Sequence, residues 1–100
     1  MQVINQSFSF GPLTGSGPQV ITQTVSFPSP VSQATAFLSG FRAQYQQGHD
    51  RPMGRLEIQV TVQNVSGTDV LLNLQLGLRD WSGNWDDPYE GEISVSVIGE

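Results

Sequence analysis

The chain has 100 residues, no cysteine, a net charge of −5 at pH 7 and an isoelectric point near 4.5. This acidic balance argues against nucleic acid as a partner, because binding to phosphates requires a basic face. Without cysteine the chain has neither a disulfide nor a thiolate metal site. A chain of this length can bury a core of its own, so we expect residues 1–100 to form a single domain.

The sequence carries no sign of membrane insertion or export. No apolar run approaches the roughly 20 residues that a membrane-spanning helix needs. The first residues lack the basic and apolar regions of a secretory signal, which leaves the compartment open. Only 13% of residues are charged and none is Lys. Such a low surface charge favours association between copies of the chain.

Two strands are predicted before residue 28. Residues 2–10 alternate apolar and polar side chains with a period of two, and residues 19–27 do the same. The segment 11–18 between them is rich in Gly and Pro and therefore predicts a turn. The second strand is expected to end at residues 28–30, because neither proline there can donate to a ladder.

The segment 31–45 is harder to interpret, because its apolar side chains fall on both parities. This pattern fits a strand covered on both faces, or a bent strand with a bulge near Gly40. A short helix is the less favoured alternative. Residues 46–54 are polar, contain two glycines and a proline, and predict a loop.

The strongest strand signal comes from residues 56–63 and 70–78, which alternate around a predicted turn at 64–68. They indicate an antiparallel hairpin with one buried and one wet face. A closing strand is predicted at 93–97. Six strands without a helical period indicate an all-β fold, namely a six-stranded antiparallel β-sandwich.

The segment Asp80–Gly91 holds three of the five Asp residues, both Trp residues and one of the two Tyr residues. Such a loop should stand at the rim of the scaffold, where binding groups usually lie. Its aromatic rings are suited to stack on a sugar while its polar groups accept hydrogen bonds from the hydroxyls. The candidates in the loop are Asp80, Trp81, Asn84, Trp85, Asp86, Asp87 and Tyr89. We expect Trp85 to be the more exposed platform, whereas Trp81 is as well suited to plug the end of the sandwich.

A calcium site is the alternative for the acidic residues, because Ca²⁺ takes six to eight oxygen ligands from such loops. Its candidate ligands are Asp80, Asp86, Asp87 and Glu90. Their spacing does not follow the EF-hand pattern. Without an ion, the two adjacent aspartates are expected to pair with Arg79, Arg55 or His49.

Catalysis is not expected, and no cofactor other than Ca²⁺ is indicated. Paired carboxylates can hydrolyse glycosides, but a shallow loop on a small chain encloses little. The lone His49 cannot form a zinc site without other strong ligands, and we interpret it as a surface or interface residue.

The chain resembles the H-type lectin domain, the family typified by the snail agglutinins and the carboxy-terminal domain of the discoidins. The resemblance spans roughly residues 22–98. It is carried by Val25-Ser26-Phe27, Pro30-Val31, Phe37-Leu38-Ser39-Gly40-Phe41, Arg55-Leu56-Glu57-Ile58, Ser66-Gly67-Thr68 and Ser94-Val95-Ser96-Val97-Ile98. The cysteines of the family are absent, and the loop at 80–91 is longer.

This resemblance implies a sandwich that forms trimers, sometimes stacked as hexamers, with galactose or N-acetylgalactosamine bound between subunits. The strand arginine of the family falls on Arg55, its tryptophan near Trp81 and its tyrosine near Tyr89. The functional hypothesis is therefore an oligomeric carbohydrate-binding module, in which several copies of a weak site raise avidity. The alternative is a structural β-sandwich that assembles with copies of itself through residues 31–45 and binds no sugar.

Overall fold

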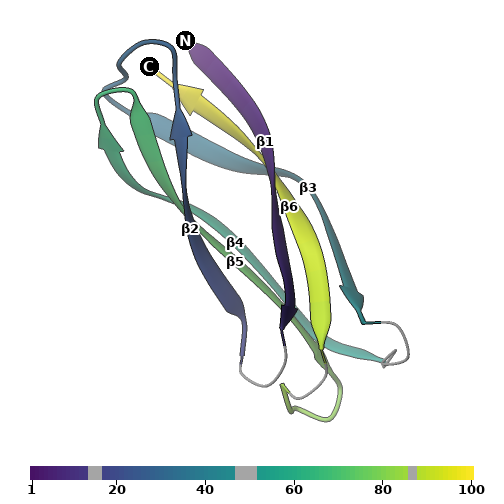
Figure 1. Cartoon of the computed structure of the whole chain (residues 1–100). Helices are drawn as coiled ribbons and strands as arrows, with labels where there is room; N and C mark the ends of the chain where they lie inside the picture. The colour runs from purple at the N-terminus through teal and green to yellow at the C-terminus, as the bar shows by residue number, and fades with distance from the viewer. Residues whose placement is uncertain (14–16, 47–51, 86–87) are drawn as a thin grey trace.

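The computed structural model describes residues 1–13, 17–46, 52–85 and 88–100. The described part contains six strands: β1 (Gln2–Leu13), β2 (Gln19–Ser26), β3 (Ala34–Tyr45), β4 (Met53–Ser66), β5 (Asp69–Asp80) and β6 (Tyr89–Gly99) (Figure 1). They form two antiparallel three-stranded sheets, with the orders β1-β6-β3 (the first sheet) and β2-β5-β4 (the second sheet). The predicted all-β sandwich is confirmed.

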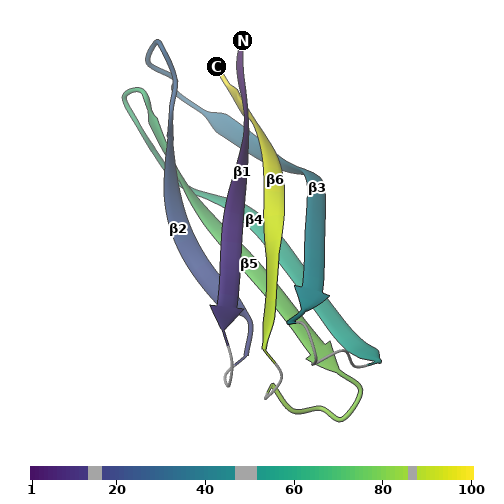
Figure 2. The same cartoon turned by 45° about the vertical axis from the view of Figure 1, so that its right-hand side comes forward.

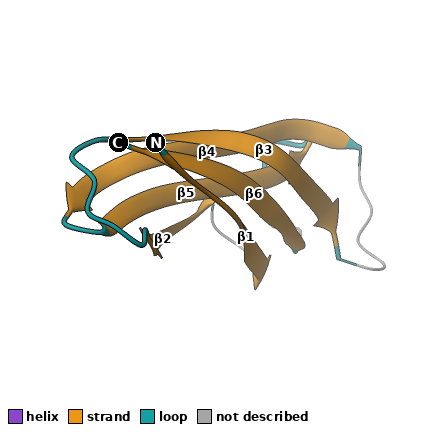
Figure 3. Cartoon of the chain, turned by 90° about the horizontal axis from the view of Figure 1, so that it is seen from above, coloured by secondary structure: helices purple, strands orange, loops and turns teal. Residues whose placement is uncertain are grey.

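Figure 3 shows only strands and their connections. Within the described ranges, accordingly, there is no helix of the length and apolar character that crossing a membrane requires.

The core lies between the two sheets and is built by period-two alternation. The central strands β5 and β6 supply most of it, because each has a neighbour on both sides. The fully buried side chains include Val70, Leu72, Leu74, Leu76, Ile93, Val95 and Val97. Burying each of them contributes about 1.5–3 kcal/mol to stability. The alternation predicted for residues 2–10 and 19–27 is reflected in the core, where Phe8, Phe10, Val25 and Phe27 are buried.

The predicted bulge near Gly40 is present in β3. Leu38 pairs with Val95 and Phe41 with Ile93, so three steps on β3 correspond to two on β6. The extra residue moves the odd-numbered positions after Gly40 to the core-facing side, which explains the apolar residues on both parities. β3 is an edge strand, and Leu38 and Phe41 remain 43% and 51% exposed despite facing inward.

Strands continue through three glycines that sequence patterns assign to turns or loops, namely Gly11, Gly54 and Gly91. β4 begins at Met53 instead of after Gly54, and β6 begins at Tyr89 instead of after Gly91. A Cβ at Gly91 would lie 2.1 Å from the carbonyl oxygen of Arg42. This glycine therefore permits a close approach between two paired strands and does not mark a turn. As a result, the connection between β5 and β6 spans only residues 81–88.

The molecule is elongated, 46 × 19 × 17 Å, and the strands run up and down its length. The connections β1–β2, β3–β4 and β5–β6 lie at one end, which we call the rim, and both termini lie at the other (Figure 1). Figure 2 shows the strands of the second sheet crossing those of the first at an angle. The rim therefore gathers three connections, including the segment with the predicted binding residues.

Candidate functional site at the rim

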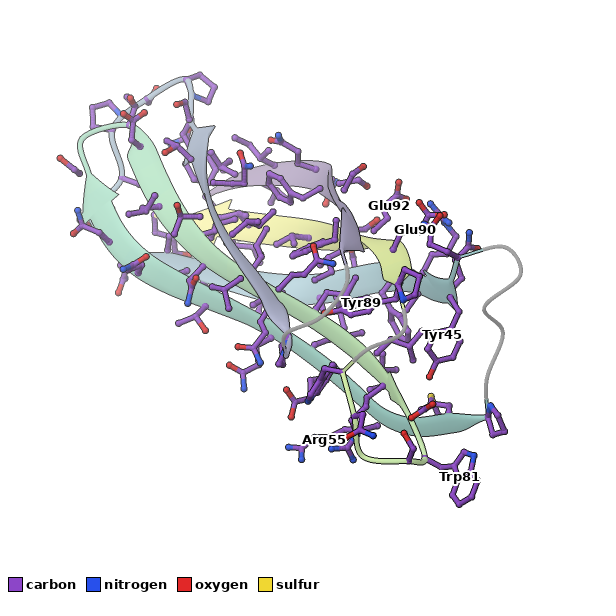
Figure 4. All side chains as sticks on the ribbon, turned by 60° about the horizontal axis from the view of Figure 1, so that its bottom comes forward. Tyr45, Arg55, Trp81, Tyr89, Glu90 and Glu92 are labelled. Carbon is purple, nitrogen blue, oxygen red and sulfur yellow. The ribbon has the colours of Figure 1, made fainter. Side chains whose placement is uncertain are left out.

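Trp81 is the most exposed aromatic residue among the described residues, at 74% of its surface. Its backbone is nevertheless fixed, because its N–H donates a 3.2 Å hydrogen bond to the carbonyl oxygen of Pro52. Gly54 lets the start of β4 pack against this segment, since a Cβ there would lie 2.6 Å from the Trp81 Cα. The indole projects outward from the rim (Figure 4). Trp81 is thus an anchored residue with a solvent-facing ring.

Trp85 is half-buried, and the expectation that it is the more exposed platform is wrong. Its Cη2 would lie 3.0 Å from a Cβ on Gly77, and Pro18 packs against the same position. The Arg79 Cζ lies 5.7 Å from the centroid of the Trp85 ring, within range of a cation–π contact. Because Gly77 has no side chain, the Trp85 indole packs directly on the outer face of the second sheet. The exposed aromatic ring of the segment is therefore Trp81.

Tyr89 is a core residue, only 2% exposed, and its ring is not accessible to a sugar. Its hydroxyl donates a 2.8 Å hydrogen bond to the carbonyl oxygen of Gly17. Its ring centroid lies 6.3 Å from that of Trp85, with a tilt of 53° between the planes. Burial raises the pKa of the Tyr89 phenol above its ordinary value of 10.0, against a smaller lowering by hydrogen bonds with Gln19. The residue that plugs the end of the sandwich is therefore Tyr89.

Asp80 is also turned inward, at 6% exposure. Its Oδ1 accepts hydrogen bonds from the backbone N–H of Ser82 at 3.0 Å and from the Ser82 hydroxyl. The carboxylate thus stabilises the first turn after β5, as Asp commonly does. In this position it supports the backbone beneath Trp81 and does not face an incoming sugar.

Arg55 is exposed on the outer face of the second sheet and forms an ion pair with Glu57. It lies directly opposite Arg79 in the β4–β5 register. Asn84 is exposed at the rim, where its backbone N–H donates a 3.4 Å hydrogen bond to the Ser82 hydroxyl. The predicted residues that the structure presents to solvent are therefore Trp81, Asn84 and Arg55.

The proposed calcium ligands are divided between the two sheets where they are described. Asp80 faces inward from the second sheet, whereas Glu90 lies on the outer face of the first sheet and accepts a 3.1 Å hydrogen bond from Gln44 Nε2. Asp86, Asp87 and His49 lie outside the described residues, and so does any pairing they make. Across 1–13, 17–46, 52–85 and 88–100, no three His, Cys, Asp or Glu side chains gather as a metal site.

A pocket of about 240 Å³ lies at the far end of the molecule, away from the rim. Its lining consists of Gln33, Ala34, Thr35, Phe37, Ile98 and Glu100. None of these positions was singled out by the sequence patterns as a binding residue. This pocket is therefore distinct from the candidate site at the rim.

Arg79 is the rim residue that sequence patterns identify only as a counter-ion. Period-two alternation along β5 was the available signal, because it places Arg79 on the same face as Gly77. What alternation does not reveal is that Trp85 folds back over both positions.

No protein-family model, curated protein or solved structure matches this chain.

Proposed function

We propose that the chain is an oligomeric, lectin-like carbohydrate-binding module whose sugar platform is Trp81. The observation that carries this proposal is an indole 74% exposed on a backbone fixed by a hydrogen bond to Pro52. Leaving an indole in water forgoes the free energy that its burial would supply. A rigid, outward-facing aromatic ring at the end of a sandwich supports binding of a flat, partly apolar ligand such as a pyranose.

Polar groups for the sugar hydroxyls stand near this platform. The Arg55 guanidinium offers donors from the neighbouring strand, and Asn84 offers both a donor and acceptors from the same connection. Galactose and N-acetylgalactosamine are the proposed sugars on the strength of the resemblance. A site built on a single exposed ring binds weakly, so the proposal includes a trimer or hexamer that raises avidity.

A glycan array with the purified protein, run once with Ca²⁺ and once with a chelator, tests the function. We expect selective retention on galactose-type glycans. A signal that requires Ca²⁺ would assign the acidic residues of the 80–91 segment to a metal site. A blank array from protein with an intact cooperative unfolding transition would contradict the proposal.

A second candidate function is self-assembly without sugar binding, and the exposed apolar residues of β3 favour it. Leu38 and Phe41 face inward yet remain half-exposed, and Phe37 is half-exposed on the opposite face. β3 is a twelve-residue edge strand without Lys or Pro, the residues that commonly protect such edges. Self-assembly is common to both candidate functions, since a lectin of this type also assembles, and the two differ in whether the rim binds sugar.

A further inference from the structure

We propose that the rim carries an anion site formed by Arg55 and Arg79, and that the sugar it selects bears a carboxylate. This inference rests on the proposed carbohydrate binding and specifies the ligand class. Its starting point is the register of the second sheet, in which Arg55 and Arg79 are direct partners on the outer face. Like charges directly opposite one another destabilise a sheet, so an anion placed between them would relieve an existing cost.

Glu57, the described carboxylate beside the two arginines, is already engaged. Glu57 forms the ion pair with Arg55 through Oε1, and its Oε2 accepts a 3.2 Å hydrogen bond from Gln75 Nε2. Among the described residues, two cations therefore share one carboxylate, which gives these three side chains together one surplus positive charge in a chain of net charge −5. Within the described ranges, Arg79 makes no ion pair at all.

The Arg79 side chain is positioned before any ligand arrives. The Trp85 ring lies over its guanidinium, and Gly77 and Pro18 seat the ring from below. The Arg79 Nε is closed off from solvent and, among the described residues, has no hydrogen-bond acceptor. In the proposed site, the two terminal nitrogens of Arg79 meet the ligand. Fixing an arginine in advance lowers the entropy cost of binding an oxyanion.

The anion site lies next to the proposed sugar platform. Trp81 follows Arg79 by two residues, at the first position after the end of β5. Asp80, the residue between them, points into the core and puts no negative charge at the surface. Figure 4 shows Arg55 and Trp81 at the same end of the second sheet. A pyranose stacked on Trp81 would therefore carry a ring substituent toward the two arginines.

The test uses a matched pair of ligands, methyl galacturonoside and methyl galactoside, which differ by a carboxylate in place of a hydroxymethyl group. Calorimetric titration of the wild type should give about tenfold tighter binding of the galacturonoside, the gain expected of a charge-assisted hydrogen bond. The preference should shrink as NaCl is raised. Arg79→Gln should abolish the preference but retain galactoside binding, whereas Arg42→Gln, on the first sheet, should leave the preference unchanged.

The outcomes separate this inference from the proposed function. Binding of both sugars with equal affinity, or a preference that survives Arg79→Gln, would overturn the anion site alone. Failure of both sugars to bind would overturn the carbohydrate proposal on which it rests. Acetate binding as tightly as the galacturonoside would show a site for simple anions and would contradict the sugar assignment.

The neighbouring aspartates require one more variant. Asp86 and Asp87 follow Trp85 directly in sequence. If the wild type shows no preference and the double variant Asp86→Asn, Asp87→Asn acquires one, the chain's own carboxylates occupy the site, and the inference is wrong. A preference present in the wild type and little changed in the double variant would support it.

Discussion

The Tyr89 hydroxyl donates a 2.8 Å hydrogen bond to the carbonyl oxygen of Gly17, which joins the start of the last strand to the turn before β2. Tyr89 begins β6 of the first sheet and Gly17 lies just before β2 of the second, so this bond closes the sandwich at the rim end. It also places the Tyr89 ring beneath Trp85 instead of in solvent. Tyr89 therefore fills the rim end of the core, whereas Trp81 is exposed to solvent.

Tyr89→Phe is expected to lower the free energy of unfolding by about 1–2 kcal/mol, because it removes a buried hydrogen bond and leaves a carbonyl without its donor. Urea denaturation measures the loss. Trp81→Phe is the matched control, and it should change stability by less than about 0.5 kcal/mol since that ring is exposed. An unchanged midpoint in the Tyr89 variant would show that the bond does not stabilise the rim.

The raised pKa of Tyr89 gives this residue a pH signature. The folded state holds the proton more tightly than the unfolded state, whose pKa is about 10.0. The contribution of Tyr89 to stability is therefore complete below pH 10 and declines as pH rises through the folded pKa. The stability advantage of the wild type over Tyr89→Phe should accordingly shrink above pH 10 in urea titrations. A difference that stays constant to pH 11 would contradict the burial argument.

Gly91→Ala should destabilise the protein by about 3 kcal/mol, because its Cβ would meet the Arg42 carbonyl oxygen at 2.1 Å and the Leu76 side chain at 2.8 Å. Neither the paired backbone nor the packed core can move aside cheaply. Gly40→Ala is the control, since the nearest atom to its Cβ would be 3.9 Å away. Thermal unfolding of the two variants compares them. Equal losses would show that backbone entropy, and not close packing, accounts for Gly91.

Gly77→Ala tests whether the packing of the Trp85 ring requires a residue without a side chain at position 77. The new methyl group would lie 3.0 Å from the indole and from the Pro18 Cβ, so the ring should lift away from Arg79. We expect a red shift of tryptophan emission and a stability loss of about 1 kcal/mol. Recording the same spectra in a Trp81→Phe background isolates the Trp85 signal. Unchanged emission in that background would show that the position of the Trp85 ring does not depend on Gly77.

The exposed edge of β3 predicts concentration-dependent association. Replacing Leu38 and Phe41 together by Ser should reduce the oligomer mass measured by light scattering, because half-exposed apolar side chains on an edge strand favour pairing with another copy. Val20→Ser, an exposed apolar residue on the second sheet, serves as control and should leave the mass unchanged. A wild type that is monomeric at all concentrations would contradict self-assembly through this strand.

The fold was predictable because alternation with a period of two is a local property of the sequence. It placed Leu72, Val95 and Phe8 correctly, since each faces the core from a regular stretch of strand. The bulge in β3 could be predicted only as one of two alternatives. Choosing between them required the register with β6, which is set by contacts between segments more than fifty residues apart.

The candidate site was less predictable, because exposure at a rim depends on packing that no local pattern encodes. Polar neighbours favoured Trp85 as the exposed ring, yet Gly77 and Pro18 hold it against the sheet. Trp81 lies beside a core strand and still faces solvent, because its backbone pairs with Pro52 and its indole turns outward. The composition of the loop indicated a binding surface, but not which ring would form it.

The central claim is that the exposed Trp81 ring is the sugar platform, and titration of N-acetylgalactosamine into wild type and Trp81→Ala by calorimetry tests it most directly. Trp81→Ala should keep its unfolding midpoint, because the ring is not part of the core. We predict saturable binding to the wild type and no detectable heat of binding with the variant. Equal affinity in the two proteins would contradict the account and move any sugar site away from the rim.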